Sequence, residues 1–257
     1  MSGILRDGPS LAGPARFVES PGRNRIYLLP PLLLLLAWLL AWWLWPRHHP
    51  QSAASAAAAG PADLTHRTLT GPRGPACIRL VVGLDVSGSM TNYAVARDAA
   101  LAQLIDWSRK NLRPDDELAV VDFAADAAAR IPPARRDKLA GAGVAAGATD
   151  GTYTNLAPAL QAIDGFRAGA CDTELVLISD AQLADLPPDA AGGKQLLRRH
   201  HIHDVRLLVP GDDVDVPQLW GMDFPEAYPT RFDGTDPDAT ALAFGQAIAG
   251  FTGQTLR

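Results

Sequence analysis

The chain has 257 residues, of which 47% are hydrophobic, and its formal net charge at pH 7 is −5. This length and hydrophobic content allow one large domain, or a smaller domain with attachments. The acidic excess is larger still after residue 45, and it argues against a nucleic-acid partner because phosphate contacts need a basic surface.

A polar segment, residues 1–25, precedes a run of 20 residues without any charge, IYLLPPLLLLLAWLLAWWLW at 26–45. At about 1.5 Å per residue, a helix of this length spans the ~30 Å hydrocarbon layer of a membrane. Three arginines lie shortly before the run and only Arg47 lies close after it. This asymmetry predicts a single-pass protein of the inner (cytoplasmic) membrane, with a cytoplasmic N-terminus and the remainder periplasmic or extracellular. A cleaved signal peptide is the alternative, although the apolar run exceeds the usual ~7–15 residues of a signal core.

The next segment, residues 46–75, is rich in Ala, Ser, Pro and Gly and shows no apolar periodicity. This composition predicts a linker between the membrane and a domain that occupies residues 76–257.

In this domain, short apolar runs alternate with segments of helical spacing. The runs predict strands at 78–84, 117–124, 128–133, 174–179, 204–210 and 230–234, and the spacing predicts helices at 93–112, 156–166, 190–201 and 241–251. Continuous apolar runs are typical of strands that are buried on both faces. We therefore expect an α/β fold, a doubly wound and mostly parallel sheet with helices on both faces. The 128–133 segment is predicted to be a short edge strand that its prolines end.

Ligands of such sheets bind beyond the carboxyl ends of the strands, where the strand order reverses. Three segments rich in oxygen-bearing side chains occupy such positions: DVSGS at 85–89, DGTYTN at 150–155 and SDA at 179–181.

The side chains of Asp85, Ser87, Ser89, Thr154 and Asp180 present hard oxygen donors, with no Cys or His among them. Such a set suits Mg²⁺, or alternatively Mn²⁺ or Ca²⁺, better than zinc. The simpler alternative is that these residues only cap the helices that follow them. Three such segments in one alternating pattern favour a metal site.

Residues 76–251 resemble a von Willebrand factor type A domain with a metal-ion-dependent adhesion site, of the membrane-anchored bacterial type. DVSGS matches the D-x-S-x-S motif of that family, Thr154 matches its loop threonine, and Asp180 matches its strand-end aspartate. The resemblance implies a divalent ion that is held by these residues and completed by a carboxylate from a protein partner. The family more often has two glycines before the threonine, so Thr152 remains an alternative to Thr154.

The resemblance implies a binding module that is not an enzyme. Two roles are open for it: assembly or maturation of an exported enzyme or complex, and adhesion to an external protein. A phosphatase-like hydrolase is disfavoured because Ser87 stands where an acid–base carboxylate is needed. A serine hydrolase is disfavoured because the G-x-S-x-G elbow is missing around Ser87 and Ser89.

Two further clusters have weaker interpretations. His200, His201 and His203 form a possible soft-metal site, but they lie between a helix and a strand, which favours a solvated helix end. The segment GDDVD at 211–215 follows a strand and is either a second cation site or, as we favour, a solvated acidic loop.

In the sheet order of the resembled family, the first and fourth strands are adjacent and parallel. Cys77 lies eight residues before Asp85, and Cys171 lies nine before Asp180. Both cysteines should then reach the same level at the opposite edge of the sheet. In an oxidising compartment we expect a disulfide between them, with two free buried thiols as the alternative.

Overall fold

The computed structural model describes residues 63–141, 146, 147, 149–166 and 169–257, all within one compact unit, Ala57–Arg257. The predicted transmembrane segment 26–45 lies outside the described residues, as do the polar segment before it and most of the predicted linker. In the described part, none of the helices is both long and apolar enough to cross a bilayer.

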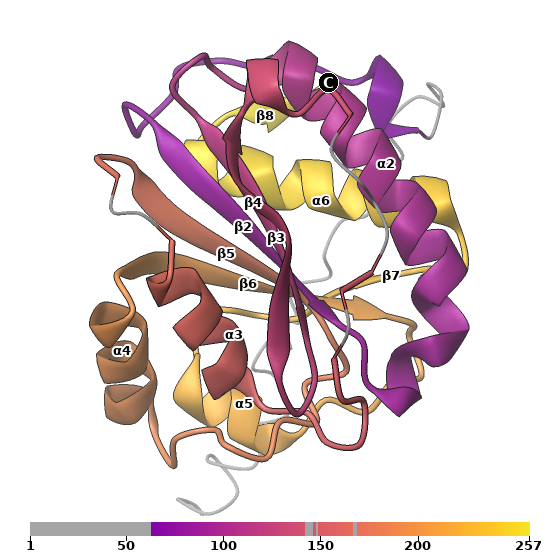
Figure 1. The fold of residues 1–257 in the computed structure, drawn as a ribbon, viewed down its shortest axis with the longest axis vertical. Coiled ribbons are helices and arrows are strands. Elements are labelled where there is room, and N and C mark those ends of the chain that lie inside the picture. Colours follow the sequence, from indigo (N-terminus) through magenta and orange to yellow (C-terminus); the bar gives the residue numbers. More distant parts are fainter. Residues whose placement is uncertain (1–62, 142–145, 148, 167–168) are drawn as a thin grey trace, which may run out of the picture. The chain divides into compact units, whose positions relative to one another are not determined.

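Six strands form the central sheet in the order β4-β3-β2-β5-β6-β7 (Figure 1). Their bounds are β2 (Ile78–Asp85), β3 (Glu117–Phe123), β4 (Ala127–Arg135), β5 (Asp172–Ile178), β6 (Ile202–Pro210) and β7 (Thr230–Phe232). All neighbouring strands are parallel except β3 and β4, which are antiparallel. This confirms the predicted α/β fold with a mostly parallel sheet.

Both faces of the sheet are covered by helices. On one face lie α2 (Ala94–Asn111) and α6 (Pro237–Thr252), and on the other lie α3 (Leu156–Asp164), α4 (Ala190–Arg199) and α5 (Gln218–Asp223) (Figure 1). All eight residues of β2 are buried. Leu80 and Val82 belong to the core under α2 and α6, whereas Val81 belongs to the core under α3. This two-sided burial explains the unbroken apolar run in the sequence.

The last part of the predicted linker is folded onto the domain. A short 3₁₀ helix, η1 (Leu64–His66), is followed by β1 (Leu69–Thr70), which pairs with β8 (Thr255–Leu256) in a second, antiparallel sheet. Leu64 is fully buried in the core that α2 and α6 form. Elements of two or three residues are too short to show a hydrophobic period, which is why the sequence pattern did not predict them. The short helix α5 was not predicted either.

Strand β4 does not end at its prolines, as we had expected. It continues to Arg135, and the pairing register with β3 shifts between Leu118 and Val120, opposite Pro132 and Pro133. The outer side of an edge strand needs no backbone donors, and an irregularity absorbs the extra residue, so prolines are tolerated there.

Candidate metal site

The strand order places the carboxyl ends of β2 and β5 side by side at the centre of the sheet. After β2 the chain forms β3 and β4 on one side of this strand, and it then forms β5, β6 and β7 on the other side. The strand order therefore reverses at β2. Leu84 pairs with Ile178, which brings Asp85 level with Ser179. This is the position at which open α/β sheets bind their ligands.

Asp85 ends β2 and is fully buried. Its Oδ1 accepts a hydrogen bond from the Ser87 amide at 2.9 Å, and its Oδ2 accepts one from the Ser179 hydroxyl at 2.6 Å. Burial raises the pKa of the Asp85 carboxyl, the hydrogen bonds from Ser179 and Ser87 oppose this rise, and the charge of Asp180 adds to it. Two carboxylates therefore lie close enough to repel each other, which is the electrostatic environment that a divalent cation stabilises.

The hydroxyls of Ser87 and Ser89 lie next to one another, with their Oγ atoms 3.2 Å apart. Ser87 is buried at the start of η2 (Gly88–Tyr93), whereas Ser89 is exposed. Ser87 occupies the N-cap position, yet its side chain makes no capping hydrogen bond within the described chain. The capping alternative therefore does not account for the Ser87 hydroxyl.

Thr154 lies in a loop that contacts the segments after both β2 and β5. The amide of Gly88 donates to the carbonyl of Gly151 at 3.3 Å, so this loop contacts the loop after β2. The carbonyl of Thr154 accepts from the amide of Ala184 at 3.0 Å, so the same loop contacts the segment after β5. Thr154 is 8% exposed. All three oxygen-rich segments thus meet at one edge of the sheet.

Thr152, the alternative to Thr154, has a different environment. It is exposed, and its hydroxyl donates to Asp150 Oδ1 at 2.5 Å. Tyr153 between the two threonines is 68% exposed. The loop therefore buries Thr154 beside the strand ends while Thr152 remains outside with an acceptor of its own.

Asp180 follows β5 and is 7% exposed. Its Oδ1 accepts from the Gln182 amide at 3.0 Å. The next residue, Ala181, has φ of 58°, in the left-handed region that a residue with a Cβ rarely adopts. Such strain persists only where the surroundings impose it, and it is concentrated at functional sites.

Two residues that support this region were not among the predicted metal ligands. Ser179 is fully buried and donates to Asp85. Asp185 accepts from the amides of Leu156 and Ala157, both at 2.7 Å, and so caps α3, the helix that follows Thr154. Ser179 has a signal in the sequence, because it directly follows a buried strand. Asp185 has none, because its partners lie 28 and 29 residues away.

Residues 80–182 match the family model of the von Willebrand factor type A domain. The described domain has the type A fold. The matched segment covers less than half of the chain. No curated protein matches the sequence of this chain.

Several solved structures are similar to this chain. Proximal thread matrix protein 1 from the mussel byssus is 14% identical with a TM-score of 0.50, over 76% of this chain and 50% of that one. Another structure of the same mussel protein, described as having a zinc-occupied MIDAS motif, is 14% identical with a TM-score of 0.45, over 68% of this chain and 48% of that one. The conserved hypothetical protein BatB from Bacteroides thetaiotaomicron is also 14% identical, with a TM-score of 0.44 over 68% of this chain and 98% of its own.

Two histidines of the cluster at 200–203 have separate acidic partners. His200 Nδ1 lies 2.7 Å from Asp164 Oδ2, and His203 Nδ1 lies 3.0 Å from Glu174 Oε1. Among the described residues, no three or more His, Cys, Asp and Glu side chains are grouped to hold a metal ion.

The acidic segment 211–215 forms a loop after β6 at the same edge as the candidate site. Its three aspartates are exposed. The Arg231 guanidinium donates to the backbone carbonyls of Gly211, Asp212 and Val214 at 2.8–3.1 Å. A basic side chain thus binds the loop backbone while the carboxylates face solvent.

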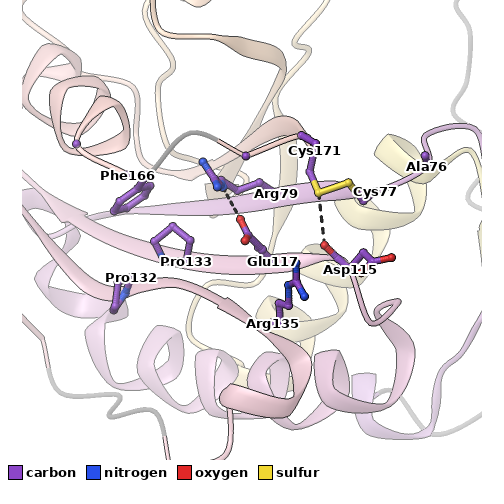
Figure 2. Close-up of a pocket in the computed structure, with 13 residues that line it drawn as sticks. Ala76, Cys77, Arg79, Asp115, Glu117, Pro132, Pro133, Arg135, Phe166 and Cys171 are labelled. Carbon is purple, nitrogen blue, oxygen red and sulfur yellow. Dashed lines mark hydrogen bonds and ion pairs between the residues drawn. A yellow bond between two sulfur atoms is a disulfide. The ribbon is translucent and has the colours of Figure 1, made fainter.

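The opposite edge of the sheet carries a disulfide and a cavity (Figure 2). Cys77 and Cys171 are bonded, with their Cα atoms 4.9 Å apart, just before β2 and β5. They line an open cavity of about 800 Å³ together with the ion pair of Arg79 and Glu117. Because Asp85 ends the strand that begins beside Cys77, this cavity and the candidate metal site lie at opposite ends of β2.

Proposed function

We propose that the type A domain is a protein-binding module that depends on a divalent metal and is not an enzyme. Asp85, Ser87, Ser89, Thr154 and Asp180 would hold Mg²⁺, Mn²⁺ or Ca²⁺. When bound, the ion supplies a positively charged centre for a carboxylate of a protein partner. The observation that carries the proposal is the pair of buried carboxylates, Asp85 and Asp180, at the adjacent carboxyl ends of β2 and β5.

The donor chemistry supports a weakly held, exchangeable ion. Two carboxylates balance the charge of a divalent cation, and hydroxyl and water oxygens complete the octahedral shell that Mg²⁺ prefers. Ser89 is exposed, so the ion would lie at the surface, where a partner can reach it.

Exposed apolar side chains next to the site support a protein partner. Tyr153, next to Thr154 in the chain, is 68% exposed, and Val95, in the first turn of α2 just after η2, is 86% exposed. Aromatic residues are enriched at protein interfaces, and an apolar contact beside the ion would add affinity to a single carboxylate.

We further propose that segment 26–45 anchors the module in the inner membrane with the domain outside the cytoplasm. There it would assist the assembly or maturation of an exported enzyme or complex, and adhesion to an external protein is the second candidate.

Titration calorimetry with Mn²⁺ tests the metal. The full chain should bind one ion with modest affinity, and Asp85→Ala should abolish binding. Asp213→Ala is the matched control, because this exposed carboxylate lies at the same edge of the sheet and should not affect binding. Unchanged affinity in Asp85→Ala would refute the assignment. The partner should in turn be retained by the wild type in Mg²⁺, be released by chelator and not be retained by Asp85→Ala.

A further inference from the structure

A row of charged side chains begins at the candidate metal site and passes from the first turn of α2 to β4 and β3; the side chains of Arg97, Arg130 and Asp122 are buried in it, and the Asp98 side chain is 37% exposed. Arg97, in the first turn of this helix, is 4% exposed. Its Nη1 donates to the backbone carbonyl of Asp85 at 2.8 Å, and its Nε lies 3.4 Å from Asp98 Oδ1. The guanidinium thus holds the peptide unit at which β2 ends and the segment with Ser87 and Ser89 begins.

From Asp98 on α2, the row of charged side chains continues to β4, the edge strand of the sheet. Arg130 of β4 has a fully buried side chain, and its Nη1 donates to Asp98 Oδ1 at 2.8 Å. Its Nε donates to both carboxylate oxygens of Asp122 on β3, at 2.8 and 2.9 Å. Such charge-assisted bonds of a planar guanidinium fix both distance and orientation.

The last link reaches the loop that carries Thr154. Asp122 Oδ2 accepts from the amide of Gly147. A Cβ at Gly147 would lie 2.9 Å from the Cβ of Ala128, so this close approach requires a glycine. Beyond Gly147, the amide of Ala125 donates to the Asp150 carbonyl at 2.9 Å, which holds the same loop against the end of β3.

Stability alone gives little reason for this arrangement. The side chains of Arg130 and Asp122 are fully buried, and desolvation consumes most of what such an ion pair gains, so apolar residues of similar size are often as stabilising. Pairs with the partly exposed Asp98 are screened by solvent and stabilise the fold little. What the pairs do provide is fixed geometry. Metal ligands from separate loops need this, because they must be held within about 0.5 Å of a productive arrangement.

We propose that Arg97 is a positioning residue of the metal site. Through Asp98, Arg130 and Asp122 it holds the loop of Asp85 and Ser87 at a fixed separation from the loop of Thr154. This inference rests on the proposed function, because positioning matters for a metal only if the site binds one. The fixed separation of the two loops, however, should exist in the metal-free protein as well.

The test compares Arg97→Met and Arg97→Lys in the full chain, with Arg109→Met as the control. Arg109 lies on the same helix, but its ion pair with Asp106 is exposed and 3.7 Å long. In the metal-free protein, Arg97→Met should increase amide hydrogen exchange at residues 86–90 and 149–155 and leave the peptides of β5 unchanged. Arg97→Lys should restore part of the protection, since it keeps the charge and one donor.

Mn²⁺ titration of the same proteins is the second measurement. Arg97→Met should weaken binding about tenfold or more, as the loss of outer-shell partners typically does, and Arg109→Met should bind like the wild type. Wild-type affinity in Arg97→Met would overturn the proposal, as would exchange that rises at 86–90 but not at 149–155.

Two further variants keep the result decisive. If Arg97→Met does not fold, Asp98→Ala removes the carboxylate oxygen to which both Arg97 and Arg130 donate, and it should also increase exchange at 149–155. If the wild type binds no Mn²⁺, the proposed function fails, but hydrogen exchange in the metal-free variants still decides whether the row of charged side chains positions the two loops.

Discussion

At the scale of single residues, Glu174 is a carboxyl group that is buried far from the candidate site. It is 2% exposed on β5, pairs with Asp204 of β6, and has one oxygen, Oε2, with no hydrogen-bond partner in the described chain. Burial raises its pKa to about 7, opposed by His203 and assisted by the charges of Asp204 and Asp172.

The raised pKa of Glu174 predicts a pH-dependent stability. Since the folded-state pKa lies above the ordinary value of 4.5, the protonated group favours folding. This contribution is complete below about pH 4.5 and is lost as the pH rises through about 7. Glu174→Gln mimics the protonated form, so its melting temperature should exceed that of the wild type more at pH 8 than at pH 5.

Thermal unfolding of both proteins across this pH range provides the measurement. Because His203 Nδ1 lies 3.0 Å from Glu174 Oε1, the comparison is repeated in a His203→Gln background. A difference in melting temperature that stays constant with pH would contradict the assignment.

At the scale of elements, two glycines predict opposite outcomes of the same substitution. A Cβ at Gly193 of α4 would collide with the backbone oxygen of Asp223 at the end of α5, whereas a Cβ at Gly221 would meet no atom of the described chain within 4 Å. Gly193→Ala should cost about 1–3 kcal/mol through forced backbone shifts. Gly221→Ala should gain up to about 1 kcal/mol because alanine favours the helix.

Urea unfolding of the two variants measures both effects. Equal stabilities would show that α4 and α5 do not pack as tightly as Gly193 indicates.

The disulfide belongs to the same scale, because it joins the starts of β2 and β5. It closes a loop with a sequence separation of 94 residues, for a nominal ~4–5 kcal/mol in the chain-entropy model and usually less in practice. Cys77→Ser with Cys171→Ser should therefore lower the stability. It should leave Mn²⁺ affinity unchanged, since the bond lies at the edge opposite Asp85.

Alkylation under denaturing, non-reducing conditions, followed by mass spectrometry, tests the bond itself. Two modified cysteines in unreduced protein would exclude it.

At the scale of the whole molecule, the prediction concerns the membrane. The uncharged segment 26–45 and the arginines before it predict a single span with the domain outside the cytoplasm. A reporter that is active only outside the cytoplasm, fused after Arg257, should give signal in the membrane fraction. Recovery of the domain as a shortened, soluble protein would show instead that the segment is a cleaved signal peptide.

The sequence by itself determined the fold class and most of the candidate site. Strands buried on both faces must be apolar throughout, so the central strands and the alternation of strands and helices were visible as a pattern. Asp85, Ser87 and Ser89 form one contiguous motif, and Asp180 is the second residue after a buried strand. Their positions depend on local chain geometry, which a sequence pattern records.

Only the tertiary structure decided which distant residues support that site. Arg97 binds the Asp85 carbonyl, Ser179 binds its carboxylate, and Asp185 caps the helix after Thr154. The same holds for the pairing of β1 with β8 and for the extension of β4 beyond its prolines. Each of these depends on contacts between residues far apart in the chain, and the free energy of such contacts leaves no periodic trace in the sequence.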